Sequence, residues 1–162
     1  MADIYDFETY EPRKGVGHLL HRVRTELLAA VDREFAADEA LAAMDVSSAQ
    51  FVIMASLSLG GVKSASDLCK GMSYDAGAMT RMIDRLEEKG LLRRSRDPGD
   101  RRLVNLELTE KGTAAMPRMR LCAMRVLNRF LQGFSKAEAR QLEGFLTRML
   151  ENAPRAAAPP AT

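Results

Sequence analysis

The sequence predicts a mainly α-helical fold with one small β-hairpin (α+β), in which a winged helix-turn-helix lies between helices at both ends of the chain. Three observations support this prediction. Apolar residues recur every three or four positions through most of the chain, two polar helix starts stand close together at Ser64 and Ser73, and the turn DPGD (97–100) separates two β-prone runs. A hairpin directly after a helix-turn-helix is the arrangement of a winged helix.

The composition is typical of one helix-rich globular domain. The chain has 162 residues, of which 46% are hydrophobic, 28% charged and 6% aromatic. The low aromatic content argues against a protein that binds single-stranded nucleic acid by base stacking. There is no run of about 18 apolar residues, and the acidic N-terminus lacks the features of a signal peptide. We therefore expect a cytoplasmic protein with no membrane partner.

The N-terminal third of the chain predicts two helices. After an acidic lead (1–14), apolar residues at 16, 19, 20, 23, 27, 31 and 35 mark one face of a long helix at about 15–38. Ser47, followed three residues later by Gln50, forms a capping-box start for a second helix at about 48–59.

The next segment predicts a helix-turn-helix. Ser64 and Asp67 start a short helix (65–71), and Ser73 starts a longer one (74–89) that ends at a glycine. The longer helix carries polar or charged residues on one face, namely Thr80, Arg81, Asp84 and Arg85, and apolar residues on the other, namely Met79, Ile83 and Leu86. A polar face on the second helix suits insertion into the major groove of DNA, although many helical proteins contain such a corner.

A basic hairpin follows this helix. The runs LLRRSR and LVNLEL are β-prone, and the second alternates apolar and polar residues. Around the turn lie five arginines: Arg93, Arg94, Arg96, Arg101 and Arg102. With two aspartates against them, segment 93–102 carries 5 − 2 = +3 in a chain of net charge +2, whereas residues 1–11 hold four acids and no base. Basic residues concentrated at one tip indicate that the protein binds a polyanion through this part of its surface.

Two more amphipathic helices precede the tail. Thr109 and Glu110 start one that reaches about residue 132, and Pro117 should bend it or delay its regular start. Ser135 and Glu138 form a capping box for another that reaches about residue 152. The tail offers little to pack and should be disordered.

The terminal helices predict a dimer. Their apolar faces, which include Leu19, Val23, Leu27, Leu142, Phe145 and Met149, are too broad to leave in water.

We divide the chain into five regions: an acidic lead (1–14), an N-terminal dimerisation helix and linker (15–46), a winged helix-turn-helix (47–109), C-terminal dimerisation helices (110–152) and a disordered tail (153–162).

The order of these elements, together with RLEEKGLLRR (85–94), DPGDRR (97–102) and LELTEKG (106–112), resembles the MarR family of bacterial transcription regulators. The resemblance spans about residues 15–150. It implies a homodimer with interleaved terminal helices, whose two recognition helices suit double-stranded DNA with a palindromic operator. It also implies a repressor that a small aromatic acid releases from the operator.

The resemblance assigns DNA-binding residues. On the recognition helix they are Ser73, Ala76, Gly77, Thr80 and Arg81, and in the wing they are Arg96, Asp100, Arg101 and Arg102. Arg102 would enter the minor groove while Asp100 holds it, and Arg96 and Arg101 would meet phosphates. A narrow minor groove concentrates negative potential, which attracts a guanidinium. We interpret Asp75 as a helix cap or an arginine partner rather than a base reader. The alternative for the arginines is that they only solvate an exposed loop.

The resemblance also places an effector, often a phenolic or other aromatic carboxylate, between the dimerisation helices and the helix-turn-helix. The sequence offers His18, His21 and Arg22 from the first helix and Phe51 and Met54 from the second. A carboxylate needs a cationic or hydrogen-bonding partner, which the first three can supply. The histidines could instead be polar groups of the dimer interface. As a metal site they fall short of a zinc ligand set, so no metal or other cofactor is expected.

Alternative functions have less support. The chain contains no GxSxG, HExxH, P-loop or GxGxxG motif, so we do not expect an enzyme. Cys69 and Cys122 fit no ligand spacing and are best read as small buried apolar residues. A redox-sensing regulator would need an exposed thiol of low pKa, and the family's thiol sensors carry it in the first helix, where this chain has none. A ligand-independent architectural DNA-binding protein remains a further alternative.

Overall fold

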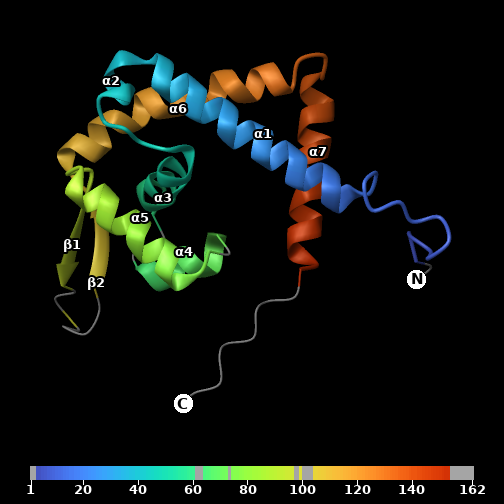
Figure 1. Ribbon diagram of the computed structural model, residues 1–162, viewed down its shortest axis with the longest axis horizontal. Helices are drawn as coiled ribbons and strands as arrows, with labels where there is room; N and C mark the ends of the chain where they lie inside the picture. Colours follow the sequence, from blue (N-terminus) through green and yellow to red (C-terminus); the bar gives the residue numbers. More distant parts are fainter. Residues whose placement is uncertain (1–2, 61–63, 73, 97–98, 100–103, 154–162) are drawn as a thin grey trace. The chain divides into compact units, whose positions relative to one another are not determined.

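The computed structural model describes residues 3–60, 64–72, 74–96, 99 and 104–153 (Figure 1). In this part of the chain the elements are α-helices and one two-stranded antiparallel hairpin, which confirms the predicted mainly helical fold. The chain divides into two compact units, Met1–Leu127 and Asn128–Thr162. The five regions drawn from the sequence stay a prediction, and most of the expected disordered tail (153–162) lies outside the described residues.

The first unit begins with a long helix and a short one. α1 (Val16–Ala37) confirms the helix predicted at 15–38, whereas α2 (Glu39–Ala42) was not predicted. The Asp38 carboxylate starts α2 by accepting from the backbone N–H of Leu41 (3.1 Å), and the Leu41 side chain is buried. A helix of four residues is too short to produce a periodic apolar pattern, so sequence reasoning placed it in the linker.

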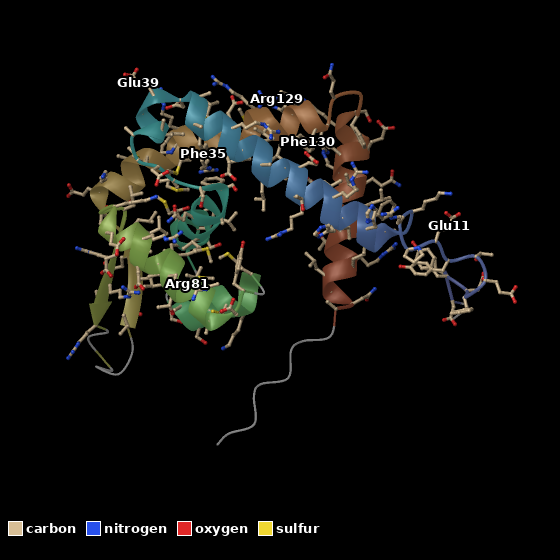
Figure 2. All side chains as sticks on the ribbon, viewed as in Figure 1. Glu11, Phe35, Glu39, Arg81, Arg129 and Phe130 are labelled. Atoms are coloured by element: carbon tan, nitrogen blue, oxygen red, sulfur yellow. The ribbon has the colours of Figure 1, made fainter. Side chains whose placement is uncertain are left out.

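Helix α3 (Ser48–Ser58) carries part of the core of the first unit. Its predicted capping box is confirmed, because Ser47 Oγ accepts from the Gln50 N–H (3.3 Å) and Gln50 Oε1 accepts from the Ser47 N–H (3.2 Å). The Phe51 ring meets that of Phe35 on α1 edge to face, with centroids 5.7 Å apart. Phe35, labelled in Figure 2, is buried and joins α1 to α3.

Helix α4 (Ala65–Met72) is the first helix of the helix-turn-helix. Its start at Ser64 is confirmed, because Ser64 Oγ accepts from the Asp67 N–H (3.2 Å) and donates to the Asp67 carboxylate (2.7 Å). Leu68 is buried, and α4 packs against α5.

Helix α5 (Ala76–Glu88) is the second helix, and it begins later than predicted. The sequence suggested Ser73 as the cap of a helix at 74–89. The structure shows that Asp75 is the N-cap, because its Oδ1 accepts from the Ala78 N–H (2.8 Å), which confirms the interpretation of Asp75 as a helix cap. Ser73 itself lies outside the described residues. The predicted apolar face is confirmed by the burial of Met79, Ile83 and Leu86.

The hairpin follows α5 directly (Figure 1). Strand β1 (Leu92–Arg96) pairs antiparallel with β2 (Val104–Leu108), with Leu92 opposite Leu108 and Arg94 opposite Leu106. Leu92 and Leu106 are buried and attach the hairpin to the core. Most of the predicted Pro-Gly turn lies outside the described residues.

Two helices complete the described chain. α6 (Glu110–Phe130) is regular from its first turn, so the predicted delay at Pro117 is wrong. Thr109 fixes that turn upstream of the proline: its Oγ1 accepts from the Gly112 N–H (3.0 Å) and its carbonyl from the Thr113 N–H (2.8 Å). α7 (Lys136–Glu151) belongs to the second unit and begins with the predicted capping box. No helix in the described part of the chain is long and apolar enough to cross a membrane.

Candidate nucleic-acid interface

The N-terminal half of α5 presents an exposed surface of small, polar and basic residues. Ala76, Gly77, Thr80 and Arg81 are all exposed, and Figure 2 labels Arg81 on this helix. Thr80 Oγ1 donates to the Ala76 carbonyl (2.8 Å), which leaves the hydroxyl oxygen able to accept. A Cβ at Gly77 would lie 3.2 Å from Asp75 Oδ1 and 3.4 Å from Arg81 Nη1, so glycine keeps this surface flat between two charged groups. Such a surface allows close approach to base edges and phosphates.

Arg96 ends β1 and is exposed. No ion pair of Arg96 with another described residue is seen. The other predicted wing contacts, Asp100, Arg101 and Arg102, lie outside the described residues. Their predicted roles, like that of Ser73, stay predictions.

Two arginines of the basic hairpin are engaged within the protein. Arg93 donates through Nε (3.0 Å) and Nη2 (2.7 Å) to Glu107 on β2. Hydrogen bonding by Arg93 is the main reason that the pKa of Glu107 lies below its usual value. Arg94 pairs with Asp84 and Glu87 of α5, and its pKa is raised chiefly by the hydrogen bond to Asp84. Part of the basic character of this hairpin is therefore neutralised.

The predicted effector residues differ in their exposure. On α1, His18 is half-buried while His21 and Arg22 are exposed. On α3, Phe51 is half-buried against Phe35 and Met54 is fully buried in the core. Their effector roles stay predictions.

A cavity of about 670 Å³ opens elsewhere in the first unit. Its lining includes Asp32, Leu41, Gln50, Met82, Arg85 and Lys89, and none of the five predicted effector residues. Acidic and basic side chains are mixed in this lining, so the cavity shows no clear preference for an anion.

One contact near α5 was missed by sequence reasoning. Arg24 Nη2 on α1 donates to the hydroxyl of Tyr74 (3.3 Å), which stands just before α5. The contact joins the first helix to the helix-turn-helix. The two residues are 50 positions apart, and no local pattern predicts such a contact.

Apolar side chains remain exposed along the terminal helices. They include Leu19 (52% exposed) and Val23 (53%) on α1 and Phe145 (47%) on α7, whereas Leu27 packs against the core. α7 has no buried residue among those described. In proteins, most of the stability of such a helix comes from packing of its apolar face, so a partner surface for α7 is expected.

Both cysteines are free thiols. Cys122 is buried, and burial raises the pKa of its thiol, while Cys69 is half-buried and also free. In the part of the chain that the structure describes, no group of three or more His, Cys, Asp or Glu residues could hold a metal ion.

Comparisons with known proteins agree with this geometry. The sequence profile of the MarR family matches residues 46–104. The transcriptional repressor NicR of Pseudomonas putida is 30% identical over 147 residues, which cover 91% of this chain and 89% of NicR. BpsR of Bordetella bronchiseptica, whose DNA binding is regulated by 6-hydroxynicotinic acid, is 30% identical with a TM-score of 0.72, over 90% of this chain and 99% of that one. A cysteine-to-serine variant of MarR from Escherichia coli in complex with operator DNA is 27% identical with a TM-score of 0.70, over 83% and 93%.

Proposed function

The chain belongs to the MarR family of transcription regulators, and we propose that it is a dimeric repressor that leaves a palindromic operator when a small aromatic carboxylate binds. The observation that carries the proposal is the exposed surface of α5, with Thr80 and Arg81 above a buried apolar face, directly followed by a hairpin that presents Arg96. A helix in the major groove and a hairpin in the neighbouring minor groove would use these surfaces together.

The proposed dimer is supported by the exposed apolar faces of the terminal helices. Side chains between about two-fifths and one-half exposed recur on three of them: Leu19 and Val23 on α1, Met124 and Leu127 on α6, and Leu142, Phe145 and Met149 on α7. When a second copy of the chain covers these side chains, apolar area is removed from water, which stabilises the dimer by about 25 cal/mol per Å² of buried area. We expect an obligate interface of more than about 2,000 Å².

A mobility-shift assay on the DNA upstream of the protein's own gene tests the proposed DNA binding. The expected result is one discrete complex that survives an excess of unrelated DNA at physiological salt, because specific binding is typically at least about 10³-fold tighter than nonspecific binding. Equal competition by unrelated DNA would favour an architectural protein.

In the wing, Arg102→Ala is expected to weaken operator binding by about 1 to 3 kcal/mol, the scale of one good base contact. The reason is that a guanidinium fits the negative potential of a narrow minor groove. Fluorescence anisotropy with labelled operator measures the change. Arg93→Ala is the control, because Arg93 pairs with Glu107 inside the hairpin. Unchanged affinity in a folded Arg102→Ala protein removes the wing tip from the mechanism.

The proposed effector is an aromatic carboxylate. One relative at 30% identity supports this class: the DNA binding of BpsR is regulated by 6-hydroxynicotinic acid, which is an aromatic carboxylate. NicR, also 30% identical, is a repressor, which supports the proposed repression. His18, His21 and Arg22 lie within two turns of α1 and provide cationic or hydrogen-bonding groups on accessible side chains. The ligand must bind the low-affinity form of the dimer more tightly than the DNA-bound form, since only differential affinity shifts the equilibrium.

Changing His18, His21 and Arg22 singly to alanine tests the effector site. At least one variant is expected to bind 6-hydroxynicotinic acid or a related aromatic acid about tenfold more weakly, by calorimetry, because a charged hydrogen bond to the carboxylate is lost. The same variant should need correspondingly more ligand to release the operator. Arg33→Ala, an exposed arginine of the same helix, is the control. If all three variants bind and respond like the parent, the signal site lies elsewhere.

A further inference from the structure

A single arginine ties the first strand of the wing to helix α5. Arg94 Nη2 donates to Asp84 Oδ1 (2.5 Å), and its Nη1 donates to Glu87 Oε2. The backbone N–H of Arg94 also donates to Glu87 Oε1 (3.2 Å). We call Arg94, Asp84 and Glu87 the Arg94 clamp.

The burial of neighbouring residues holds both sides of the clamp in place. Asp84 and Glu87 are three residues apart and share one face of α5, and each follows a residue that is at most 1% exposed, Ile83 or Leu86. Rotating α5 to move the carboxylates away would therefore expose its buried face. On the strand side, Arg94 shares a face of β1 with Leu92, which is 1% exposed. The Arg94 side chain is accordingly only 32% exposed.

The neighbouring arginine has a different partner. Arg93 points to the opposite face of β1, is 66% exposed, and pairs with Glu107 on β2. Glu107 also accepts from Ser95 Oγ (3.1 Å). Arg93 therefore links the two strands to each other, whereas Arg94 links the hairpin to α5.

We infer that Arg94 is a positioning residue for DNA binding, which fixes the angle between the wing and α5 so that both elements meet one duplex, and that it does not itself contact DNA. The inference rests on the proposed function. A helix and a hairpin that move independently would have to be ordered on binding, which lowers affinity. The clamp also neutralises two carboxylates that would otherwise repel nearby phosphates.

Operator binding by Arg94→Ala, measured by fluorescence anisotropy over a range of salt concentrations, tests the inference. The expected affinity is about tenfold weaker, the scale of a lost charged hydrogen-bond network. A triple variant that adds Asp84→Asn and Glu87→Gln removes the exposed carboxylates and should remain about tenfold weaker, with a wild-type salt dependence. Each phosphate contact contributes about 0.9 to the slope of log affinity against log salt. A slope reduced by about one in the triple variant, or a return to wild-type affinity, overturns the inference.

Arg93→Ala is the matched control, since it removes the same side chain one residue away on the same strand. Its affinity should stay within about twofold of wild type, because the pair it breaks lies inside the hairpin. An equal loss in Arg93→Ala and Arg94→Ala would show that the helix-to-wing link has no special role.

A measurement without DNA separates this inference from the proposed function. Residual dipolar couplings of backbone amides in the free protein should fit one alignment tensor for α5 and the hairpin in the wild type and in Arg93→Ala. In Arg94→Ala the hairpin couplings should shrink relative to those of α5. Unchanged couplings in Arg94→Ala overturn the inference, whether or not the protein binds an operator. Failure of the wild type to bind specific DNA contradicts the proposed function alone.

Discussion

Phe145→Glu is expected to convert the dimer into monomers and to weaken operator binding by at least about 100-fold. Phe145 is 47% exposed on α7, a helix with no buried residue among those described, so a second copy is the proposed cover of its apolar face. A carboxylate cannot be buried in such an interface without a partner. A monomer also loses the gain in avidity from engaging two half-sites, which ranges from about 10² to 10⁴. Analytical ultracentrifugation at micromolar concentration and anisotropy measure the two effects.

Thr147→Glu is the control for this prediction. Thr147 is exposed on the same helix, two positions from Phe145 and so about 160° away around the helix axis, clear of the apolar stripe. The variant introduces the same charge and should remain a dimer with wild-type affinity. A Phe145→Glu protein that still sediments as a dimer would place the interface elsewhere.

Gly112→Ala is expected to destabilise the protein by about 3 kcal/mol, at the upper end of the range for overpacking. A Cβ at Gly112 would lie 2.1 Å from the backbone carbonyl oxygen of Leu91, a distance that no heavy atoms tolerate without movement of the chain. Leu91 precedes β1, so relief of this clash displaces the hairpin as well. Thermal and urea unfolding at a fixed protein concentration measure the loss.

Gly71→Ala provides the matched comparison. Gly71 is exposed in α4, and a Cβ there would meet nothing within 4 Å. Alanine at a helical position relieves the entropy cost of glycine, so we expect a change between zero and a gain of about 1 kcal/mol. Equal stability of Gly112→Ala and the wild type would mean that α6 does not approach Leu91 as closely as the structure shows.

Local interactions explain why most of the fold could be predicted from the sequence. The capping boxes at Ser47 and Ser135 each join residues three positions apart, and the apolar residues of α5 repeat with the helical period. Both features can therefore be recognised from a short stretch of sequence. The start of α5 was misplaced because Ser73 and Asp75 are both suitable caps, and the structure shows that Asp75 is the one that caps the helix. Helix α2 was too short to give a periodic signal.

Contacts between distant residues explain what the sequence could not predict about the site. The sequence placed arginines around the wing, but it could not show that Arg94 contacts Glu87 on α5 rather than DNA. It contained the glycine at position 112, but the reason for it is the carbonyl of Leu91, 21 residues earlier (112 − 91). It could not show that Met54, predicted as an effector contact, is fully buried, because that burial comes from packing against the rest of the core.

Footprinting of the wild-type protein on the DNA upstream of its own gene tests the central proposal most directly. Two copies of α5 and of the wing should protect two half-sites of a palindrome, with centres one helical turn apart, about 34 to 36 Å, or a whole multiple of it. Both protected regions should disappear together when an aromatic carboxylate effector is added. Protection of a single half-site, or protection that spreads without sequence preference, would contradict a dimeric operator-binding regulator.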